Sequence, residues 1–276
     1  MRVIAILATY NERRFITPCL EHLSRHGVEA YLIDNCSTDN TVELAEPHLD
    51  RGLVGIESFP RGKDDIYAWR SLLARKEELA RELEADWFLH VDPDEIRLPP
   101  SGSETLSEAL QSADQEGFNA VNFTEFTFIP TEEEPDHDHA EFRRTLRTYY
   151  PFEPRPHHKV TAWKATSDIE LARSGGHRID FPGLRIRPQP FPMKHYLFLS
   201  IPHAIEKYAQ RRYDPTEVAS GWHGWRAEIA AGDIVLPGES MLRRTHADDD
   251  LDFGAPRTEH YLAELIGLSA KLHDSG

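Results

Sequence analysis

The sequence has few cysteines and no long apolar stretch, and both absences exclude classes of protein. It contains two cysteines in 276 residues, Cys19 and Cys36, too few for the disulfide framework of a small secreted domain. No stretch approaches the roughly 20 consecutive apolar residues that a membrane-spanning helix requires. Residues 1–8 are apolar but lack the basic region of an export signal. We therefore expect a cytoplasmic protein with free thiols and no integral membrane segment.

Positive charge is also scarce in this chain. Lysine and arginine number 31 against 47 aspartates and glutamates, which gives a net charge of −16. Such a field repels nucleic-acid backbones and anionic membrane surfaces, so we expect no nucleic-acid partner. An acidic protein that holds an anionic ligand needs local positive charge, and a divalent cation supplies it where carboxylates are plentiful.

Short apolar runs alternate with amphipathic segments through the first hundred residues. The predicted strands are 3–8, 30–33, 53–59 and 87–91, and helical periodicity fills the segments between them. Parallel strands need crossover connections, so this order predicts an α/β fold with a single Rossmann-type mixed sheet flanked by helices. Ligands bind at the carboxyl ends of the strands in such a sheet. We therefore expect the polar loops that follow these strands to converge.

The regular alternation ends in the second half of the chain. We expect a helix at 103–113 and a strand at 118–128, whose apolar period slips near Glu125 and suggests a β-bulge. An acidic loop at 130–140 follows, which we expect to be mobile, and its His137-Asp138-His139 segment resembles a set of ligands but is expected to be solvated. Ser200 is suited to cap a later helix, and a closing helix is expected at 259–272. We divide this one compact domain into an α/β half at 1–128, a region at 129–213 and a helical extension at 214–276.

Two carboxylates follow the fourth predicted strand directly. Asp92 and Asp94 flank Pro93 on a short turn, from which their hard oxygens can reach a Mg²⁺ or Mn²⁺ ion. A bound cation stabilises the negative charge that develops on a nucleoside-diphosphate leaving group. The alternative is an acidic turn that only caps the next element. We interpret Asp92 and Asp94 as metal ligands, with Asp92 also at the diphosphate.

Other polar side chains follow the first three strands. Asp34, with Ser37 beside it, can accept hydrogen bonds from a base or a ribose, although Ser37 and Asp39 can equally cap the helix that follows. At the third strand a cation can meet a phosphate, or can simply face solvent. The further donor-binding candidates at this edge are Thr9, Asn11, Glu12, Arg61 and Lys63.

Three segments together resemble the family 2 glycosyltransferases, which have the GT-A fold. They are Ala8-Thr9-Tyr10-Asn11-Glu12, residues 33–41 and residues 88–95, and their order and spacing are those of that family. The resemblance covers the first half of the chain. It implies that the loops of Asn11 and Asp34 hold the nucleoside, and that Asp92 and Asp94 bind ribose, diphosphate and metal.

The second half resembles a subgroup of that family with a later glycine–histidine element and a later His-Tyr element. In this sequence the elements are Gly175-Gly176-His177 and Lys194-His195-Tyr196. A neutral imidazole can be a third metal ligand, and we favour His195 for that role, with His177 on the acceptor side of the site. A structural histidine is the alternative for each. Trp163 can line the acceptor pocket or serve as an ordinary core residue.

An inverting transfer needs a carboxylate that removes the proton of the acceptor hydroxyl. The Glu-Asp pair that family 2 enzymes usually present is not evident, so Glu125 is the first candidate and Asp168 the second; an ordinary polar strand residue is the alternative for Glu125. We predict a metal-dependent glycosyltransferase that moves a sugar from a nucleoside-diphosphate donor, a UDP-sugar, to a hydroxyl acceptor with inversion. The alternative is a catalytically silent nucleotide-sugar or carbohydrate-binding protein.

Overall fold

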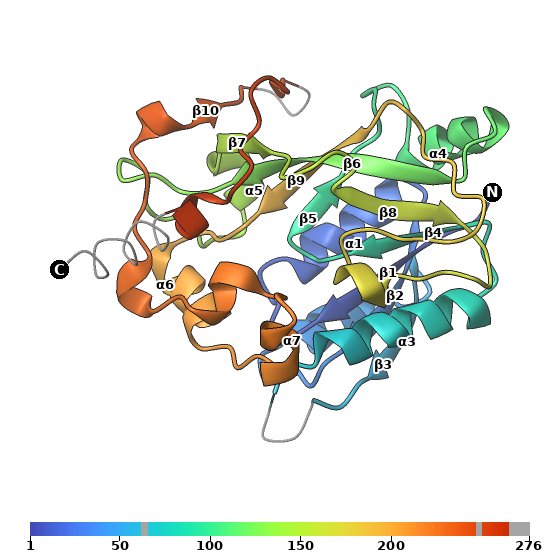
Figure 1. Cartoon of the computed structure of the whole chain (residues 1–276), viewed down its shortest axis with the longest axis horizontal. Helices are drawn as coiled ribbons and strands as arrows, with labels where there is room; N and C mark the ends of the chain where they lie inside the picture. Colours follow the sequence, from blue (N-terminus) through green and yellow to red (C-terminus); the bar gives the residue numbers. More distant parts are fainter. Residues whose placement is uncertain (62–65, 247–249, 265–276) are drawn as a thin grey trace. The chain divides into compact units, whose positions relative to one another are not determined.

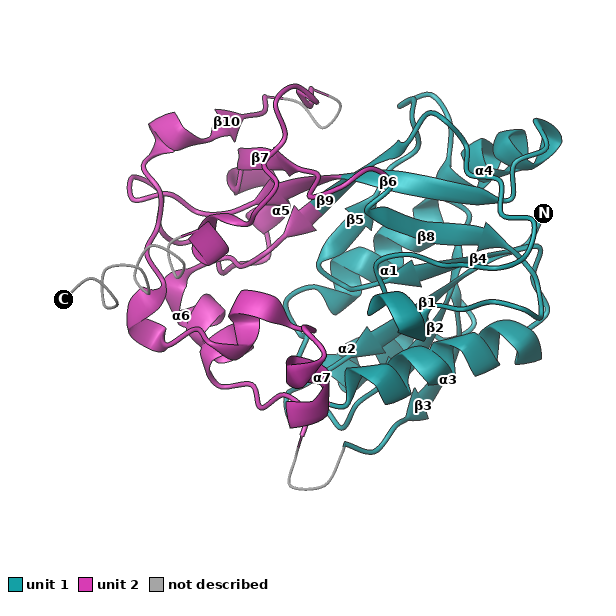
Figure 2. Ribbon diagram, viewed as in Figure 1, with its two compact units in different colours: residues 1–62, 68–124, 157–194 teal, residues 63–67, 125–156, 195–276 magenta. Residues whose placement is uncertain are grey.

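The computed structural model describes residues 1–61, 66–246 and 250–264 (Figure 1). It divides into two compact units (Figure 2). Unit 1 comprises residues 1–62, 68–124 and 157–194, and unit 2 comprises residues 63–67, 125–156 and 195–276. Each unit is assembled from separate segments of the chain, so neither coincides with the consecutive regions predicted at 1–128, 129–213 and 214–276. Those regions stay a prediction.

Four parallel strands form the first part of the sheet in unit 1. β1 (Val3–Thr9) lies between β2 (Glu29–Asp34) and β4 (Trp87–Val91), and β3 (Leu53–Ser58) pairs with the other side of β2. Each strand ends within one residue of its predicted position. β1 and β4 are almost wholly buried because helices cover both faces, which is typical of parallel sheets.

The helices of unit 1 follow the predicted apolar periodicity. They are α1 (Ile16–Arg25), α2 (Thr41–Ala45), η1 (Glu46–His48), α3 (Trp69–Glu82), α4 (Leu106–Gln115) and η3 (Ala172–Ser174). α2 is shorter than expected because Pro47 lies in the 3₁₀ turn η1. α4 begins three residues later than predicted because Thr105 and Glu108 form a capping box at its start.

Further strands extend the sheet of unit 1 beyond β4. β8 (Lys159–Lys164) pairs antiparallel with β4 and with the first residues of β6 (Ala120–Phe128). β5 (Glu95–Arg97) pairs with β9 (Phe191–Tyr196). The predicted α/β class with a mixed sheet is therefore confirmed. The register of β6 against β8 shifts between residues 121 and 122, so the irregularity lies there and not near Glu125 as predicted.

Unit 2 contains a smaller antiparallel sheet and short helical turns. Residues 125–128 of β6 pair with β7 (Thr148–Phe152), which also pairs with β10 (Arg243–Arg244). The helical elements are α5 (Phe142–Thr145), α6 (Ile201–Ala204), η4 (Ile205–Ala209), α7 (Pro215–Ala219), η5 (Gly224–Ala227), η6 (Ala231–Asp233) and η7 (Glu239–Met241). Their apolar side chains form a core of their own around Tyr150, Phe198 and Tyr208.

Two expectations for the second half have different outcomes. Ser200 caps α6 through its hydroxyl, as predicted. The acidic loop is not simply solvated: the backbone N–H of His137 donates to Leu199 O at 2.8 Å, and its Nδ1 lies 2.9 Å from Thr145 Oγ1. His137 is only 4% exposed, so its predicted solvation is wrong.

Both cysteines are free thiols, as expected, with Cys19 buried in α1 and Cys36 exposed. Most of the closing helix predicted at 259–272 lies outside the described residues, although residues 261–264 are helical. None of the described helices combines the length and the apolar character that crossing a bilayer requires.

Candidate functional site

The loops that follow β1 and β2 are joined by hydrogen bonds. Asn11 Oδ1 accepts the backbone N–H groups of Thr38 at 2.7 Å and Asp39 at 3.3 Å, while Asn11 N donates to Ser37 Oγ at 3.0 Å. Asn11 has a φ of +58°, which asparagine tolerates better than most residues. Asn11 and Ser37 therefore hold the two loops in register. Direct contact of either residue with a nucleotide stays a prediction.

Asp34 lies beside Thr9 at the carboxyl ends of their strands. The two are register partners in the β1–β2 pair, and Asp34 is 6% exposed. Its carboxylate accepts the N–H of Ser37 at 3.1 Å and lies at the 3.5 Å limit from Thr9 Oγ1. An ionised carboxylate has about four acceptor sites. Asp34 therefore stabilises its own turn and keeps acceptor capacity for a ligand.

Asp39 and Glu12 each accept a hydrogen bond from the backbone at the start of the helix that follows their loop. Asp39 Oδ1 accepts the N–H of Thr41 at 2.9 Å, and Ser37 Oγ accepts the N–H of Asn11. The N-cap of α2 is Asn40 and makes no side-chain capping bond, so neither Ser37 nor Asp39 is the cap of that helix. The backbone carbonyl of Glu12 accepts the N–H of Ile16 at 2.9 Å at the start of α1. A role of the Glu12 side chain in donor binding stays a prediction.

Arg61 brings positive charge to the loop that follows β3. Its guanidinium carbon lies 3.8 Å from the ring centroid of Tyr10, a cation–π geometry that fixes the head group over the first loop. Lys63, the second cation predicted here, lies outside the described residues.

Asp92 and Asp94 lie on the turn from β4 into β5. The N–H of Glu95 donates to Asp92 O at 2.9 Å and closes this turn. Because β4 pairs directly with β1, the turn is at the same edge of the sheet as Thr9. The predicted convergence of the first, second and fourth loops is therefore confirmed.

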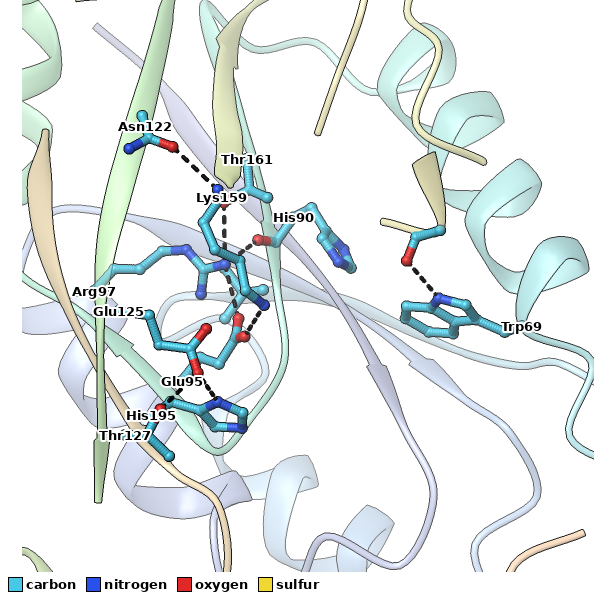
Figure 3. A network of polar contacts seen from close by, with 12 residues as sticks. Trp69, His90, Glu95, Arg97, Asn122, Glu125, Thr127, Lys159, Thr161 and His195 are labelled. Atoms are coloured by element: carbon cyan, nitrogen blue, oxygen red, sulfur yellow. Dashed lines mark hydrogen bonds and ion pairs between the residues drawn. The ribbon is translucent and has the colours of Figure 1, made fainter. Parts of the chain in front are cut away.

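Glu95 is buried behind this turn and is held by two cations (Figure 3). Its carboxylate lies 2.5 Å from Lys159 Nζ and 2.9 Å from Arg97 Nη2, and the three side chains are 2%, 10% and 0% exposed, respectively. Arg97 Nη2 also donates to His90 O at 2.6 Å and to Thr161 Oγ1 at 3.2 Å. These bonds connect β4, β5 and β8 and fix both ends of the carboxylate turn. The sequence did not lead us to predict that Glu95 holds the turn, although its position directly after Asp94 pointed to such a role.

Lys76 is a second buried cation that sequence reasoning missed. It lies on the apolar face of α3, 0% exposed, with Nζ 2.7 Å from His90 Nδ1 and 3.3 Å from Val91 O. Burial lowers the pKa of Lys76 to about 8, against the opposing effect of the Asp92 carboxylate. Burial, then Lys76, keeps the pKa of His90 well below its usual value, so the imidazole is a neutral acceptor. The burial of Lys76 could have been predicted from its position on the helix face that also carries Leu72, Leu73, Leu79 and Ala80.

The carboxylate of Asp92 differs from its neighbours because it accepts no hydrogen bond from any residue in the described ranges. Burial and then Glu95 raise the pKa of Asp92, while Lys76 lowers it. A partly buried carboxylate without donors is unfavourable unless a cation or a polar ligand joins it. Asp92 therefore carries a carboxylate at this edge that a cation or a polar ligand would stabilise.

A complete metal site is not assembled by the described part of the chain. There, no group of three or more histidine, cysteine, aspartate or glutamate side chains is arranged to hold an ion. Asp92 and Asp94 belong to unit 1, whereas His195 belongs to unit 2. The set of three predicted metal ligands therefore stays a prediction. The hard oxygens of Asp92 have the chemistry that Mg²⁺ and Mn²⁺ prefer.

Glu125 and His195 form a hydrogen-bonded pair within unit 2 (Figure 3). Glu125 Oε1 lies 2.7 Å from His195 Nδ1 and accepts the hydroxyl of Thr127 at 2.9 Å. At 1% exposure, Glu125 is too buried to meet an acceptor hydroxyl, which conflicts with its predicted role as the base. A carboxylate at Nδ1 fixes the tautomer and the ring orientation, as it does behind metal-bound and catalytic histidines. Glu125 is thus a positioning group for His195.

Two predicted site residues lie elsewhere because β8 runs antiparallel to β4. Lys164 at the end of β8 is opposite Trp87 at the start of β4, so Asp168 follows at the edge remote from Asp92. This placement does not favour Asp168 as an alternative base, and that role stays a prediction. Trp163 is 1% exposed and its ring stacks on Phe88 with centroids 5.9 Å apart. It is a core residue and does not line an acceptor pocket.

His177 lies in unit 1 and is partly exposed. Its ring stacks on that of His158, with centroids 4.9 Å apart. The preceding Gly176 has a φ of +87°, and an added Cβ there would meet His90 Nε2 at 3.1 Å. The glycine therefore allows the close approach to β4, whereas an acceptor-side role for His177 stays a prediction.

Replacing Glu95 tests whether the buried pair holds the turn. Glu95→Gln removes the charge that lies 2.5 Å from Lys159 Nζ and 2.9 Å from Arg97 Nη2. Because breaking a buried ion pair on one side is costly, we expect the free energy of unfolding to fall by about 3–5 kcal/mol in urea denaturation. Glu29→Gln is the matched control, because Glu29 pairs with Arg2 at 2.7 Å with side chains 40% and 46% exposed. It is expected to cost less than about 1 kcal/mol. Equal costs for the two variants would contradict the role given to Glu95.

Lys76 gives a prediction for the pH dependence of stability. Its ordinary pKa is 10.5 and burial lowers it to about 8, so between these values the unfolded chain binds more protons than the folded protein. The contribution of Lys76 to the free energy of unfolding therefore rises with pH there, by up to about 1.4 kcal/mol per unit. Urea denaturation at about pH 8 and about pH 9.5 should show wild type gaining relative to Lys76→Met. A constant difference between the two proteins would show that this pKa is not lowered.

Comparison with known families gives a match in the first part of the chain. Residues 4–71 match the model of a family described as glycosyl transferase family 2. No curated protein matches the chain.

Several solved structures are similar to this chain at low identity. S. aureus TarS 1–349 is 15% identical with a TM-score of 0.42, over 71% of this chain and 60% of that one. The same fragment in complex with UDP gives 14% identity and a TM-score of 0.44, over 72% and 61%. Glucosyl-3-phosphoglycerate synthase from Mycobacterium tuberculosis, with Mn²⁺, UDP and glucosyl-3-phosphoglycerate, gives 18% and 0.31, over 45% and 44%.

The chain thus spans about 60% of the length of the TarS fragment. The family match contains the first two of the three motifs on which the resemblance was based, at residues 8–12 and 33–41. Over residues 4–71 the chain carries the sequence pattern of the family 2 glycosyl transferases, and the predicted resemblance to that family is confirmed.

Proposed function

We propose that this chain is a glycosyltransferase that takes a sugar from a nucleoside-diphosphate donor, a UDP-sugar, and transfers it to a hydroxyl acceptor. The observation that carries the proposal is the carboxylate of Asp92, which lies at the carboxyl edge of the sheet without a donor in the described part of the chain. Its neighbours in the first two loops are bonded to one another. A ligand at this edge would therefore find in Asp92 a carboxylate that has no hydrogen-bond donor among the described residues.

The nucleoside part of the donor fits the side of the site formed by β1 and β2. Asp34 keeps acceptor capacity for the N–H of a base or for a ribose hydroxyl, and its carboxylate is held in place by the backbone N–H of Ser37. Arg61 over Tyr10 places a cation at the same loops, where a phosphate needs one in an acidic protein. The family match over residues 4–71 supports the same assignment.

A Mg²⁺ or Mn²⁺ ion is part of this proposal. Asp92, with Asp94 two residues later on the same turn, would hold it, and the ion would stabilise charge on the departing diphosphate. Glu95, Lys159 and Arg97 keep the turn in place. Inversion at the anomeric carbon belongs to the same proposal.

A second candidate function is a nucleotide-sugar-binding protein without catalysis. The burial of Glu125 and its bonds to His195 and Thr127 favour this alternative, because the first candidate for the base is already engaged. The two functions differ in one observable: only an enzyme releases UDP from a UDP-sugar.

Replacing Asp92 tests the donor site. Calorimetric titration of UDP, GDP and dTDP, with and without Mn²⁺, should show one nucleotide bound more tightly with metal, and Asp92→Asn should weaken it by at least about tenfold. Asp168→Asn, an exposed aspartate at the opposite edge, is the matched control and should bind as wild type does. Metal-dependent binding with UDP release from a UDP-sugar supports the enzyme, and the same binding without any release supports the second candidate. If no nucleoside diphosphate binds the folded protein, both fail.

Replacing Asp34 tests the nucleoside side separately. Asp34→Asn keeps an oxygen for the N–H of Ser37 but removes the charge and one acceptor. A hydrogen bond to a charged group contributes about 1.5–3 kcal/mol, so UDP affinity should fall by about 10- to 100-fold. The metal dependence of the remaining affinity should persist. Unchanged affinity would place the nucleoside away from Asp34.

A further inference from the structure

A second histidine–carboxylate pair lies in unit 2, on residues that the site described above does not use. His223 Nε2 lies 2.8 Å from Glu217 Oε2, and the two side chains are 7% and 4% exposed. Burial lowers the pKa of His223, against the opposing effect of Glu217. The ring is therefore neutral near pH 7, with its proton on Nε2 toward the carboxylate. Nδ1 then carries the lone pair and is a hydrogen-bond acceptor.

The backbone around His223 is held in an unusual conformation. Glu217 lies on α7, whose N-terminus is capped by the carboxylate of Asp214. The chain then turns through Gly221, His223 and Gly224, which all have positive φ, with a value of +68° at the histidine. The left-handed region is unfavourable for a residue with a Cβ, so the surrounding contacts must hold it there. The turn and the carboxylate together fix where the imidazole points.

Nδ1 of His223 is the open side of this pair. It makes no hydrogen bond with any residue that the structure describes, and it is not one of the fully buried nitrogen atoms. A group that approaches from solvent can therefore donate a hydrogen bond to it. The Glu217 carboxylate behind the ring makes Nδ1 a better acceptor than an isolated imidazole.

Aromatic rings flank the histidine. The ring centroid of Tyr213 lies 4.4 Å from that of His223, and Tyr67 lies 6.0 Å from it. The hydroxyl of Tyr213 is buried with no partner among the described residues. The guanidinium of Arg211 lies 4.9 Å from the ring centroid of Tyr67. All these residues belong to unit 2, and a backbone bond from Tyr67 N to Arg212 O, 2.9 Å, joins the two segments.

We propose that these residues, Tyr67, Arg211, Tyr213, Glu217 and His223, form a binding site for a saccharide. A sugar hydroxyl donates to Nδ1 of His223, and the C–H face of the sugar packs on a tyrosine ring, because aromatic faces combine apolar area with a polar edge. Two potential ligands are too few for a metal ion, and the net charge of −16 disfavours nucleic acid. A wholly apolar ligand would leave Nδ1 unpaired.

Binding of a saccharide to unit 2 does not rest on the proposed function. The experiment therefore measures saccharide binding at His223 and nucleotide binding separately.

The test is a titration followed by nuclear magnetic resonance on the full chain with ¹³C-labelled histidine. Methyl glycosides of glucose, galactose and N-acetylglucosamine, and their 6-phosphates, are added to wild type, and the Cε1–H signal of His223 is followed. We expect at least one saccharide to shift that signal in a saturable way. His223→Asn should weaken its binding by at least about tenfold, because asparagine tolerates the left-handed backbone but lacks the ring acceptor.

Two further variants separate recognition from folding. His157→Asn is the matched control, because His157 is an exposed histidine that also has a positive φ, +56°, and it should leave saccharide binding unchanged. Glu217→Gln should weaken binding, since the amide can bond to either tautomer of the ring. UDP titration of His223→Asn should match wild type if the nucleotide site and the fold are intact. With UDP binding intact, no shift of the His223 signal by any of these saccharides, or equal affinity of wild type and His223→Asn, would overturn the proposal.

Discussion

The buried carboxylate of Glu95 is the constraint on which the candidate donor site depends. It joins Lys159 and Arg97, so one negative charge holds together strands that are distant in sequence. Charges without partners would be costly in this interior, and the network therefore has one favourable arrangement. The turn that carries Asp92 and Asp94 directly precedes Glu95 in the chain, so this network holds the turn in place. Its geometry is set by groups that never meet a ligand, which is how a loop at a sheet edge becomes rigid enough for recognition.

In the first two loops, too, most polar residues hold the loops together and few are available to a ligand. A series of asparagine, serine, threonine and aspartate side chains follows β1 and β2, and most of their bonds are to one another. Asp34 serves both the turn and a possible ligand, whereas Asn11 only joins loops in the described structure. A motif of polar residues therefore overstates the number of ligand contacts. The bonding inside the loops is what keeps the few ligand-facing groups in place.

The sequence predicted local conformation well and long-range placement less well. The strands around β1 were predicted because both faces of each are apolar, and Ser200 was recognised as a cap because its hydroxyl acts within one turn. The positions of Asp168 and Trp163 were not predicted because β8 returns antiparallel to β4, and that pairing depends on residues about 75 positions apart. Lys76 was missed because a lysine on a helix is usually solvated, and its burial depends on partners from β4.

Histidine–carboxylate pairs recur in unit 2, and the net charge of the chain gives a reason. A protein with a net charge of −16 repels anionic ligands, so it needs cations for phosphates, while a neutral hydroxyl requires only a well-placed acceptor. An imidazole backed by a buried glutamate is such an acceptor, because the carboxylate fixes the tautomer while the ring remains neutral. Glu217 with His223 has this arrangement, and Glu125 with His195 shares the hydrogen bond between imidazole and carboxylate. Arg61 at the first loop of unit 1 and the His223 ring backed by Glu217 in unit 2 therefore suit two different kinds of ligand group, charged phosphate and uncharged hydroxyl.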